Sequence, residues 1–422
     1  MREQYSLSQW LEWIESCHPS EIDMGLERVQ KVALALGLTQ LDMKVITVAG
    51  TNGKGSTVTY LDTIYREQGY SVGAFTSPHF HEYNERIQVN GLPASDEIIC
   101  RAFQAIDQAR GKIELTYFEF GTLAALWVFK HSFLDVAILE VGLGGRLDAV
   151  NICEPDVSVV TSIGIDHVDW LGDDREVIGF EKAGIFRANK PAVCGDPNPP
   201  HSIKAHAESI GAKLFQLGSE FSLQSGEQAR FSWQGQSSEG EGLELTDIEV
   251  GSLPIENIPT AIQAVKALGL PVSDRALRLG VKLATMVGRM QTIAHSRGDI
   301  VLDVAHNPHA AERLAKVLAK SPKQQIVVLG MLADKDATAV VAALKPHVKY
   351  WLLVDLDVPR GLSAKALMAK MPEGIPRDSI ACYSDMASAV ADAVSLLDPA
   401  SSVLVAGSFF TVANALTELK DL

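Results

Sequence analysis

The residues from Val45 to Thr57 have the types and the order of a phosphate-binding loop. A β-branched apolar run leads into Gly-Thr-Asn-Gly-Lys-Gly, and a helical pattern follows. In that order, backbone N–H groups and a helix N-terminus surround a bound anion, while Lys54 places a point charge at the terminal phosphates. A chance Gly-Lys-Gly loop is the alternative, but strand, turn and helix here follow the order that the mechanism needs. The sequence therefore predicts binding of a nucleoside triphosphate.

This loop lacks the hydroxyl that usually ligates magnesium. In the common form, Ser or Thr directly follows the lysine and binds the Mg²⁺ that bridges the β- and γ-phosphates. Gly55 occupies that position here, and Ser56 and Thr57 follow one and two places later. We therefore expect the metal to take its protein ligands from elsewhere in the chain.

Polar residues directly after predicted strands are the candidates, because ligands collect at the carboxyl ends of strands in doubly wound sheets. Ser77, Glu140 and His167 follow three such strands and offer the oxygen and nitrogen atoms that a divalent cation accepts. Each has an ordinary structural explanation, since a serine can cap a turn, this glutamate can pair with Arg146, and a histidine can bind a loop carbonyl. Their shared position beside the loop favours a metal site.

Two further positions remain open on the residues alone. Lys182 lies on a predicted helix, where a solvated lysine explains the residue as well as a functional one. Asp303 ends a strand in the second half of the chain and could hold a ribose or a base. Turn chemistry around Asn307 and Pro308 explains that segment almost equally well.

Composition narrows the class of protein. A chain of 422 residues is long enough for two or three domains, and 47% hydrophobic with 21% charged residues is ordinary for a soluble enzyme. The net charge of −15 argues against nucleic acid as a partner. We see no signal peptide or spanning helix, and five scattered cysteines predict reduced packing residues. We therefore expect a cytoplasmic enzyme without a membrane partner.

Short apolar runs alternate with helical periods through both halves of the chain, which predicts an α/β fold. We expect a P-loop ATPase-type, doubly wound, mostly parallel sheet in residues 1–295, with a small antiparallel β subdomain at 218–250. A Rossmann-like α/β domain is expected in residues 296–422, after a linker at Ser296–Asp299. The predicted strands are Val45–Val48, Val72–Phe75, Val136–Val141, Val157–Ile163, Ala192–Cys194, Ile300–Val304, Ile326–Leu329, Tyr350–Val354, Ile380–Tyr383 and Val403–Ala406.

Taken together, these motifs resemble the dihydrofolate synthase/folylpolyglutamate synthase family of the Mur ligase superfamily, over nearly the whole chain. The resemblance is carried by Gly50–Ser56, Ser77–His79, Glu140–Asp148, Asp166-His167, Glu181–Phe186 and Asp303–His309. Two further stretches, Asp23–Arg28 and Leu115–Phe120, resemble the bifunctional bacterial members that hold dihydropteroate as well as folates.

The resemblance implies roles for individual residues. ATP would be bound by Thr51, Asn52, Gly53, Lys54, Gly55, Ser56, Arg289, Asp303, His306 and Asn307. Ser77, Glu140 and His167 would bind magnesium, as two ions, and Lys182 would be carbamylated to N6-carboxylysine. The pterin pocket would be lined by Asp23, Met24, Gly25, Leu26, Thr116, Tyr117, Phe118, Glu119, Leu147, Asp148 and Ala149. Lys54, His167, Lys182 and Arg289 would be the catalytic groups.

The implied reaction joins L-glutamate to 7,8-dihydropteroate and to tetrahydrofolates. A substrate carboxylate attacks the γ-phosphate of ATP, and the glutamate amine then attacks the resulting acyl phosphate. Two anions approach each other in the first step, so neutralisation by Lys54, Arg289 and magnesium is the main catalytic need. We expect a monomer, because both domains look complete.

Some positions depart from the family. An asparagine that contacts adenine commonly stands at a helix start where this chain has Thr260, while Asn257 lies three residues earlier. Phe180 stands where relatives often have arginine, and Phe410 where they often have histidine.

Other functions remain as alternatives. One is a folylpolyglutamate synthase without the dihydropteroate activity. A UDP-muramyl peptide ligase would need an extra domain before the first strand. A guanine-specific switch would need Asn-Lys-x-Asp, and Asn189-Lys190 is followed by Pro-Ala. A small-molecule kinase leaves the second domain unexplained.

Overall fold

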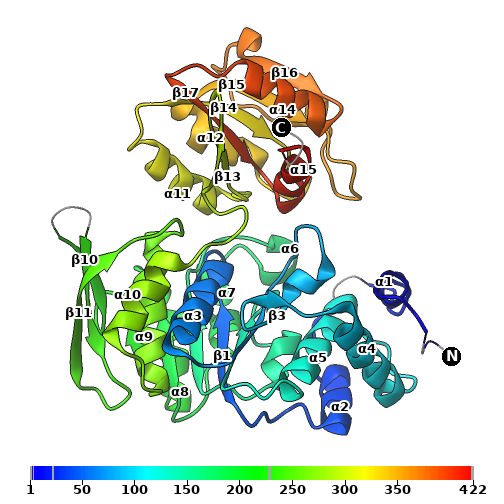
Figure 1. Ribbon diagram of the computed structural model, residues 1–422, viewed down its shortest axis with the longest axis vertical. Coiled ribbons are helices and arrows are strands. Elements are labelled where there is room, and N and C mark those ends of the chain that lie inside the picture. The colour runs from blue at the N-terminus through cyan, green and yellow to red at the C-terminus, as the bar shows by residue number, and fades with distance from the viewer. Residues whose placement is uncertain (1, 3, 21–22, 227–229, 420–422) are drawn as a thin grey trace. The chain divides into compact units, whose positions relative to one another are not determined.

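The apolar, β-branched segments of the first half form one large sheet. In the computed structural model, which describes residues 2, 4–20, 23–226 and 230–419, its strand order is β4-β3-β2-β5-β1-β6-β7-β8. Strands β1 and β3 of this sheet are labelled in Figure 1. Neighbours from β2 to β8 are parallel, whereas β3 and β4 add an antiparallel edge. The bounds are β1 Lys44–Ala49, β2 Val72–Phe75, β3 Ile87–Val89, β4 Leu92–Pro93, β5 Val136–Glu140, β6 Val157–Val160, β7 Pro191–Cys194 and β8 Lys213–Gln216.

The central strand of this sheet is covered on both faces. Five successive residues of β1, from Val45 to Ala49, are buried, and alternate residues of a strand point to opposite faces. Helix α3 packs on β1, β2 and β5, and α9 packs on β6 and β7. The helices of this unit are α1 Leu7–Glu15, α2 Glu27–Leu36, α3 Lys54–Gln68, α4 Asp96–Arg110, α5 Tyr117–Lys130, α6 Val168–Leu171, α7 Arg175–Ala183, α8 His201–Ile210, α9 Ile258–Leu268 and α10 Asp274–Leu283.

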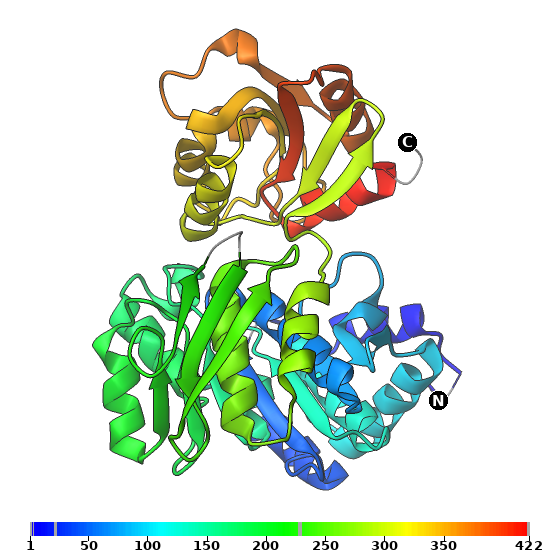
Figure 2. The ribbon, with the colours of Figure 1, turned by 60° about the vertical axis from the view of Figure 1, so that its left-hand side comes forward.

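A separate three-stranded antiparallel sheet occupies the polar segment for which we predicted a β subdomain. Its order is β11-β10-β9, with β9 at Ser222–Ser225, β10 at Arg230–Gln236 and β11 at Gly242–Glu249. Helices α9 and α10 contact this sheet, whose strands are the green arrows of Figure 2. The small β subdomain is therefore confirmed.

The second half of the chain forms its own six-stranded sheet. The order is β12-β13-β17-β14-β15-β16, and all neighbours are parallel except β12 with β13. Its strands are β12 Gln291–His295, β13 Gly298–Leu302, β14 Gln324–Leu329, β15 Val348–Val354, β16 Ile380–Tyr383 and β17 Ser401–Ala406. The helices are α11 Pro308–Leu318, α12 Ala337–Leu344, α13 Ala364–Met368, α14 Met386–Ser395 and α15 Phe409–Leu419. This is the predicted α/β domain.

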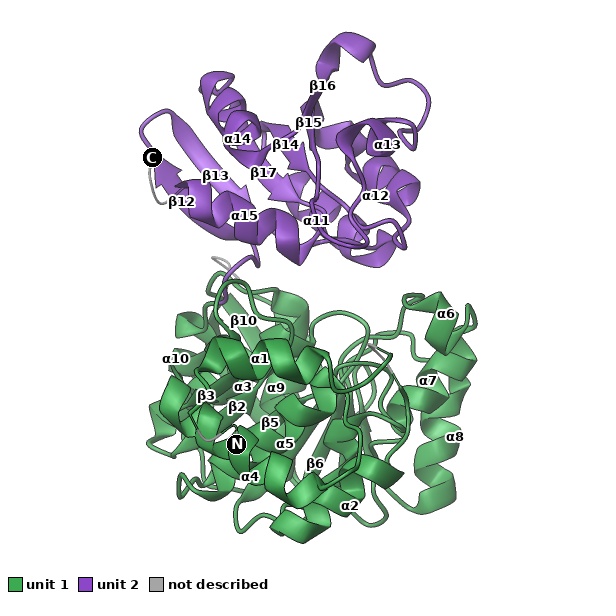
Figure 3. Cartoon of the chain, turned by 90° about the vertical axis from the view of Figure 1, so that its right-hand side faces the viewer, with its two compact units in different colours: residues 1–285 green, residues 286–422 purple. Residues whose placement is uncertain are grey.

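The two compact units are residues 1–285 and 286–422 (Figure 3). The predicted division after residue 295 is therefore too late, since it falls inside the β12–β13 hairpin, where His295 pairs with Gly298. The Ser-Arg-Gly-Asp segment that we interpreted as a linker is the turn of that hairpin and the start of its second strand, β13. Among the described residues, no helix is both long enough and apolar enough to cross a bilayer.

Candidate active site

The phosphate loop connects β1 to α3, as its sequence predicts. Helix α3 begins at Lys54, and Gly53 before it has a φ of 88°, in the left-handed region that favours glycine. The Lys54 ammonium donates to the carbonyl oxygens of Gly50 at 3.0 Å and Thr51 at 3.4 Å. The lysine therefore lies over the loop whose backbone N–H groups open the helix, which is the arrangement of an anion site.

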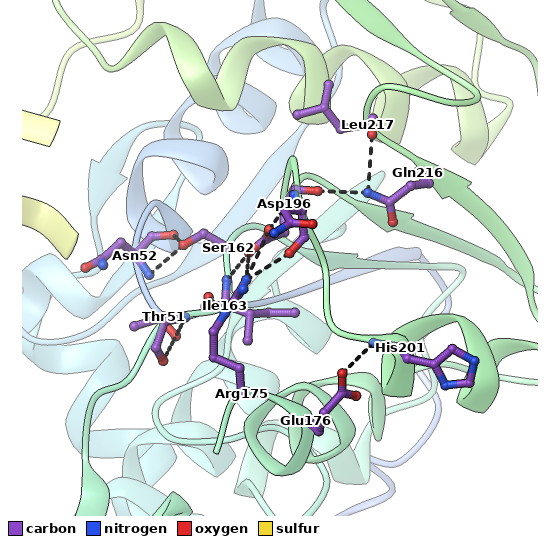
Figure 4. Close-up of polar contacts among 12 residues, drawn as sticks. Thr51, Asn52, Ser162, Ile163, Arg175, Glu176, Asp196, His201, Gln216 and Leu217 are labelled. Carbon is purple, nitrogen blue, oxygen red and sulfur yellow. Dashed lines mark hydrogen bonds and ion pairs between the residues drawn. The ribbon is translucent and has the colours of Figure 1, made fainter. Parts of the chain in front are cut away.

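The end of β6 supports this loop from the side (Figure 4). The Ser162 hydroxyl lies 2.9 Å from the carbonyl oxygen of Asn52 and 3.1 Å from its backbone nitrogen. The backbone N–H of Thr51 donates to the carbonyl oxygen of Ser162 at 2.7 Å, and the Thr51 hydroxyl bonds both the N–H and the carbonyl of Gly164 at 3.0 Å. Strand β6 therefore ends at Val160, earlier than the predicted Ile163, because the following residues turn to bind the loop.

The start of α9 brings Asn257 rather than Thr260 to the phosphate loop. A Cβ atom on Gly53 would lie 2.4 Å from the carboxamide oxygen of Asn257, so the two residues touch. Thr260 is 1% exposed, and its hydroxyl would lie 2.1 Å from a Cβ on Gly195, so it packs under β7. Asn257 is thus the asparagine of this helix start that stands beside the nucleotide loop.

Two of the three predicted metal ligands are in direct contact. The backbone N–H of Ser77 donates to Glu140 at 3.2 Å, because β2 and β5 are parallel neighbours and end side by side. Arg146, the alternative partner of Glu140, forms its ion pair with Glu181 at 2.8 Å. His167 is the residue before α6, with a φ of 53°, three residues after the Gly164 that binds Thr51.

These residues have the chemistry of a site for a hard divalent cation. Glu140 is 4% exposed, and a buried carboxylate requires hydrogen-bond donors or a cation. No group of three His, Cys, Asp or Glu side chains among the described residues could hold a metal ion. The predicted set contains only two residues of those types and takes its third ligand atom from the serine hydroxyl. A carboxylate, a hydroxyl and an imidazole suit Mg²⁺ or Mn²⁺.

The three stretches predicted to line the pterin pocket converge on the turn after β5. A Cβ on Gly142 would lie 2.6 Å from the Phe118 ring, and one on Gly144 would lie 3.5 Å from the Met24 methyl carbon. Both glycines belong to the turn that leads to Leu147, Asp148 and Ala149. Met24 and Phe118, which are far apart in the chain, therefore both lie against this turn.

Asp148 organises that turn. Its carboxylate accepts from the backbone N–H groups of Gly142 at 3.0 Å, Leu143 at 2.9 Å and Val150 at 3.0 Å. Burial raises the pKa of Asp148 to about 6, although these hydrogen bonds and the charge of Lys54 act to lower it. The Asp148 carboxylate therefore shapes the turn, and the charge of Lys54 in the phosphate loop acts on it.

Glu119, which follows Phe118 in the chain, is fixed at the start of α5. With Thr116 it forms a capping box, in which each residue binds the backbone N–H of the other. Arg28 donates to Glu119 at 3.3 Å and also to Asp23. One arginine therefore joins the two stretches that we assigned to the pterin.

Lys182 is a buried lysine and not a solvated one. It is 3% exposed on α7, and its backbone packs against Gly145, where an added Cβ would lie 3.0 Å from its carbonyl oxygen. Burial and then the charge of Lys54 lower the pKa of Lys182 to about 7, while Asp166 and Asp148 act to raise it. A substantial fraction of this amine is therefore neutral near pH 7.

In the second unit, the predicted ATP ligands gather at the end of β13. Asp303 is fully buried, accepts from the N–H groups of Met290 at 3.1 Å and Ala305 at 2.9 Å, and pairs with Arg313 at 3.4 Å. Asn307 caps α11 by accepting from the N–H of Ala310 at 2.9 Å.

The other two predicted ATP ligands, Arg289 and His306, lie near the ring of Phe409. The Arg289 guanidinium stands 5.5 Å from the centre of the Phe409 ring, and the His306 ring lies 6.3 Å from the same ring. The phenylalanine thus orders both residues within the second unit.

The comparisons with known proteins agree with this geometry. The model of the Mur ligase middle domain matches residues 48–265, and the model of the Mur ligase glutamate ligase domain matches residues 288–409. The dihydrofolate synthase/folylpolyglutamate synthase of Escherichia coli is 45% identical over 97% of this chain and 94% of its own length. The enzyme of the same name from Haemophilus influenzae is 39% identical over 97% and 96%. The chain belongs to the dihydrofolate synthase/folylpolyglutamate synthase family of the Mur ligases.

Solved structures of this family have the same fold. E. coli FolC in complex with DHPP and ADP superposes with a TM-score of 0.94 at 42% identity, over 99% of both chains. A bifunctional folylpolyglutamate synthase/dihydrofolate synthase from Yersinia pestis, complexed with AMPPNP and a Mn ion, gives 0.92 at 42% identity, again over 99% of both chains. The predicted α/β fold, the resemblance and the ligase class are confirmed, and the nucleotide switch and the kinase are excluded.

The sequence did not identify every residue that contacts the phosphate loop, its supporting segment or the pterin stretches. It left open whether Thr260 or Asn257 contacts the nucleotide, and it indicated Arg28 only as part of the stretch Asp23–Arg28. Arg175 and Asp196 were not among the predicted site residues, although Asp196 lies two residues after the predicted strand Ala192–Cys194. The rule that led to Glu140 and His167 could therefore have found it.

Proposed function

We propose that this ligase adds L-glutamate to 7,8-dihydropteroate, giving dihydrofolate, and to tetrahydrofolates, giving polyglutamates. The observation that carries the proposal is the meeting of the three predicted pterin stretches at the turn 142–149. The charge of Lys54 acts on Asp148 in this turn. A pterin bound at this turn, which follows the strand next to β1, suits a substrate whose carboxylate must reach ATP. The DHPP and ADP complex of E. coli FolC supports the same reading.

We assign the ATP phosphates to the loop Thr51–Ser56, with Lys54 as its positive charge. Asn257, which touches Gly53, joins this set as a nucleotide contact. In the second unit, Arg289, Asp303, His306 and Asn307 remain the proposed ATP ligands. Arg289 supplies the positive charge among them.

For the metal, we assign Ser77, Glu140 and His167 to Mg²⁺, and two ions remain the proposal. A divalent cation bound there supplies neutralisation of the β- and γ-phosphate charge. The Mn ions in related structures support use of a divalent metal. The Ser77 N–H fixes the orientation of the Glu140 carboxylate, so the ligand is held before any cation binds.

Lys182 is proposed to carry a carbamate. Carbamylation needs the neutral amine, which attacks CO₂ and loses a proton, and the lowered pKa of Lys182 provides that form. The product is a carboxylate that replaces a buried cation near Lys54, so the charge repulsion with that lysine becomes an attraction.

The proposed reaction has two steps. The substrate carboxylate attacks the γ-phosphorus of ATP, and the bond from that phosphorus to the β,γ-bridging oxygen breaks. ADP is the leaving group, and the product is an acyl phosphate. The glutamate α-amine then attacks the acyl carbon, loses a proton and expels phosphate. Lys54 and Arg289 neutralise the anions that must meet in the first step. We further propose that the chain acts as a monomer in the cytosol.

A coupled assay of ADP release tests the proposal, with dihydropteroate, tetrahydrofolate and a UDP-muramyl peptide supplied in turn. We expect ADP only when L-glutamate is present together with dihydropteroate or tetrahydrofolate. ADP release without either partner would overturn the ligase mechanism. Release with tetrahydrofolate but not dihydropteroate would leave a folylpolyglutamate synthase alone, and release only with the muramyl peptide would favour the cell-wall ligase.

A further inference from the structure

A buried carboxylate outside the proposed ligand sets holds the segment that supports the phosphate loop. Asp196 follows β7 and is 4% exposed. One of its oxygens accepts from the backbone N–H of Ile163 at 2.7 Å, and the other accepts from that of Asn198 at 2.9 Å. Figure 4 shows this carboxylate pointing at the residues that follow β6. A short bond to a buried carboxylate is the strong, charge-assisted kind.

Arg175 binds the same segment from the other side. Its Nε donates to the carbonyl oxygen of Ile163 at 3.0 Å, while its terminal nitrogen lies 3.3 Å and 3.4 Å from the two carboxylate oxygens of Asp196. That nitrogen also donates to the carbonyl oxygen of Asn198 at 3.0 Å. The N–H and the carbonyl of Ile163 are thus both held by one ion pair.

The residues on either side of Ile163 are the ones that grip the phosphate loop. Ser162 binds Asn52 and Thr51, and Gly164 binds the Thr51 hydroxyl. The carboxylate–arginine pair therefore holds the residue between two neighbours that make five hydrogen bonds to the loop. Arg175 is also the first residue of α7, the helix that carries Lys182, and the chain between Gly164 and Arg175 carries His167.

We propose that Asp196 and Arg175 are positioning residues for the nucleotide and metal site. By fixing Ile163, they set the place of Thr51 and Asn52 and anchor both ends of the loop that bears His167. The inference rests on the proposed roles of those residues in ATP and metal binding. Outer hydrogen-bond partners of this kind change metal affinity or activity by about 10–100-fold when they are removed.

The test compares variants at this pair with matched variants at another pair of the same unit. Asp196→Asn keeps the shape but loses the charge, and Arg175→Met removes both donors to Ile163. Arg175→Lys keeps the charge without the fork that serves two acceptors. The controls are Asp62→Asn and Arg66→Met, because Asp62 is also a buried carboxylate, bonded to Arg66 at 2.8 Å. The hydrogen bond and ion pair given for these two residues join them to each other.

For each folded variant, we measure KM for ATP, the Mg²⁺ concentration for half-maximal activity, kcat and Tm. We expect Asp196→Asn and Arg175→Met to raise KM for ATP and the half-maximal Mg²⁺ concentration by about tenfold or more. Arg175→Lys should raise both quantities less than Arg175→Met does. The control variants should lower Tm with both constants within about twofold of the wild type. If the Asp196 and Arg175 variants behave like the controls, the pair is merely structural and the inference is wrong.

Direct titration with ADP keeps the inference testable if the reaction is not the one proposed. ADP affinity is measured by calorimetry on the full-length wild type and on every folded variant of the pair, of which Arg175→Lys is the mildest. If the wild type binds ADP but forms no ADP from ATP with any pteroate or folate, the proposed function alone is refuted. Equal ADP affinity in wild type and in every folded variant of the pair would refute the positioning role alone.

Discussion

The carboxylate of Glu140 accepts the backbone N–H of Ser77 at 3.2 Å, although the two residues are 63 positions apart in the chain. The contact exists because β2 and β5 are adjacent and parallel, with Phe75 in register with Leu139. Their polar residues therefore emerge together at the carboxyl edge of the sheet, next to β1 and its phosphate loop. This edge is where a loop without its own metal hydroxyl can find replacement ligands.

The first prediction concerns that carboxylate. Glu140→Gln keeps the shape of the side chain and removes its charge, so we expect kcat to fall by about 100-fold or more with a weaker metal site. Calorimetric titration with Mn²⁺ in the presence of ADP measures the metal affinity separately from turnover. Glu154→Gln is the control, because Glu154 is an exposed residue that pairs with Arg187. Unchanged Mn²⁺ affinity in Glu140→Gln would remove this residue from the metal site.

The second prediction concerns Lys182 and pH. Because burial lowers its pKa to about 7, the neutral amine that reacts with CO₂ is the minor form below that pH and the major form above it. We therefore expect carbamate occupancy, followed by ¹³C NMR in labelled bicarbonate, to rise between about pH 6 and pH 8. Lys182→Arg should show no such signal and should lose activity. A signal of the same size in the arginine variant would place the carbamate elsewhere.

The third prediction concerns the arginine that joins the two pterin stretches. Arg28→Ala leaves the 3%-exposed Glu119 without one of its donors, and an unpaired buried acceptor costs about 1–3 kcal/mol. We expect KM for dihydropteroate to rise about tenfold, with KM for ATP nearly constant as the internal control. A parallel rise in both constants would mean that the substitution disturbs the whole unit and not the pocket.

The sequence predicted most of the parts of this site because one local pattern carried each of them. Glycines and a lysine between a strand and a helix define the phosphate loop, and polar residues after strands mark the sheet edge that we propose for the metal. The unit boundary was misplaced because Gly298 suits a linker and a hairpin turn equally well. Strand β12 was missed because its residues alternate between partly buried and exposed, without a continuous apolar run.

Contacts between distant segments could not be predicted from the sequence patterns. Arg175 and Asp196 lie 21 residues apart, and neither belongs to a motif that names its partner. Their importance depends on Ile163, whose backbone groups have no sequence signature. Asn257 and Thr260 show the same limit on a smaller scale, because a shift of three residues along a helix start decides which one reaches the loop.

The last prediction separates those two residues by their effects on nucleotide binding and on stability. Asn257 touches Gly53, so Asn257→Ala should weaken ADP binding by about tenfold, or ~1.4 kcal/mol, with little change in Tm. Thr260 is buried against Gly195, so Thr260→Val should change Tm and leave ADP affinity within about twofold. Calorimetric titration with ADP and a thermal melt of each variant give the two readouts. The reverse pattern, with ADP affinity lost only in Thr260→Val, would make the threonine the nucleotide contact and leave the asparagine as packing.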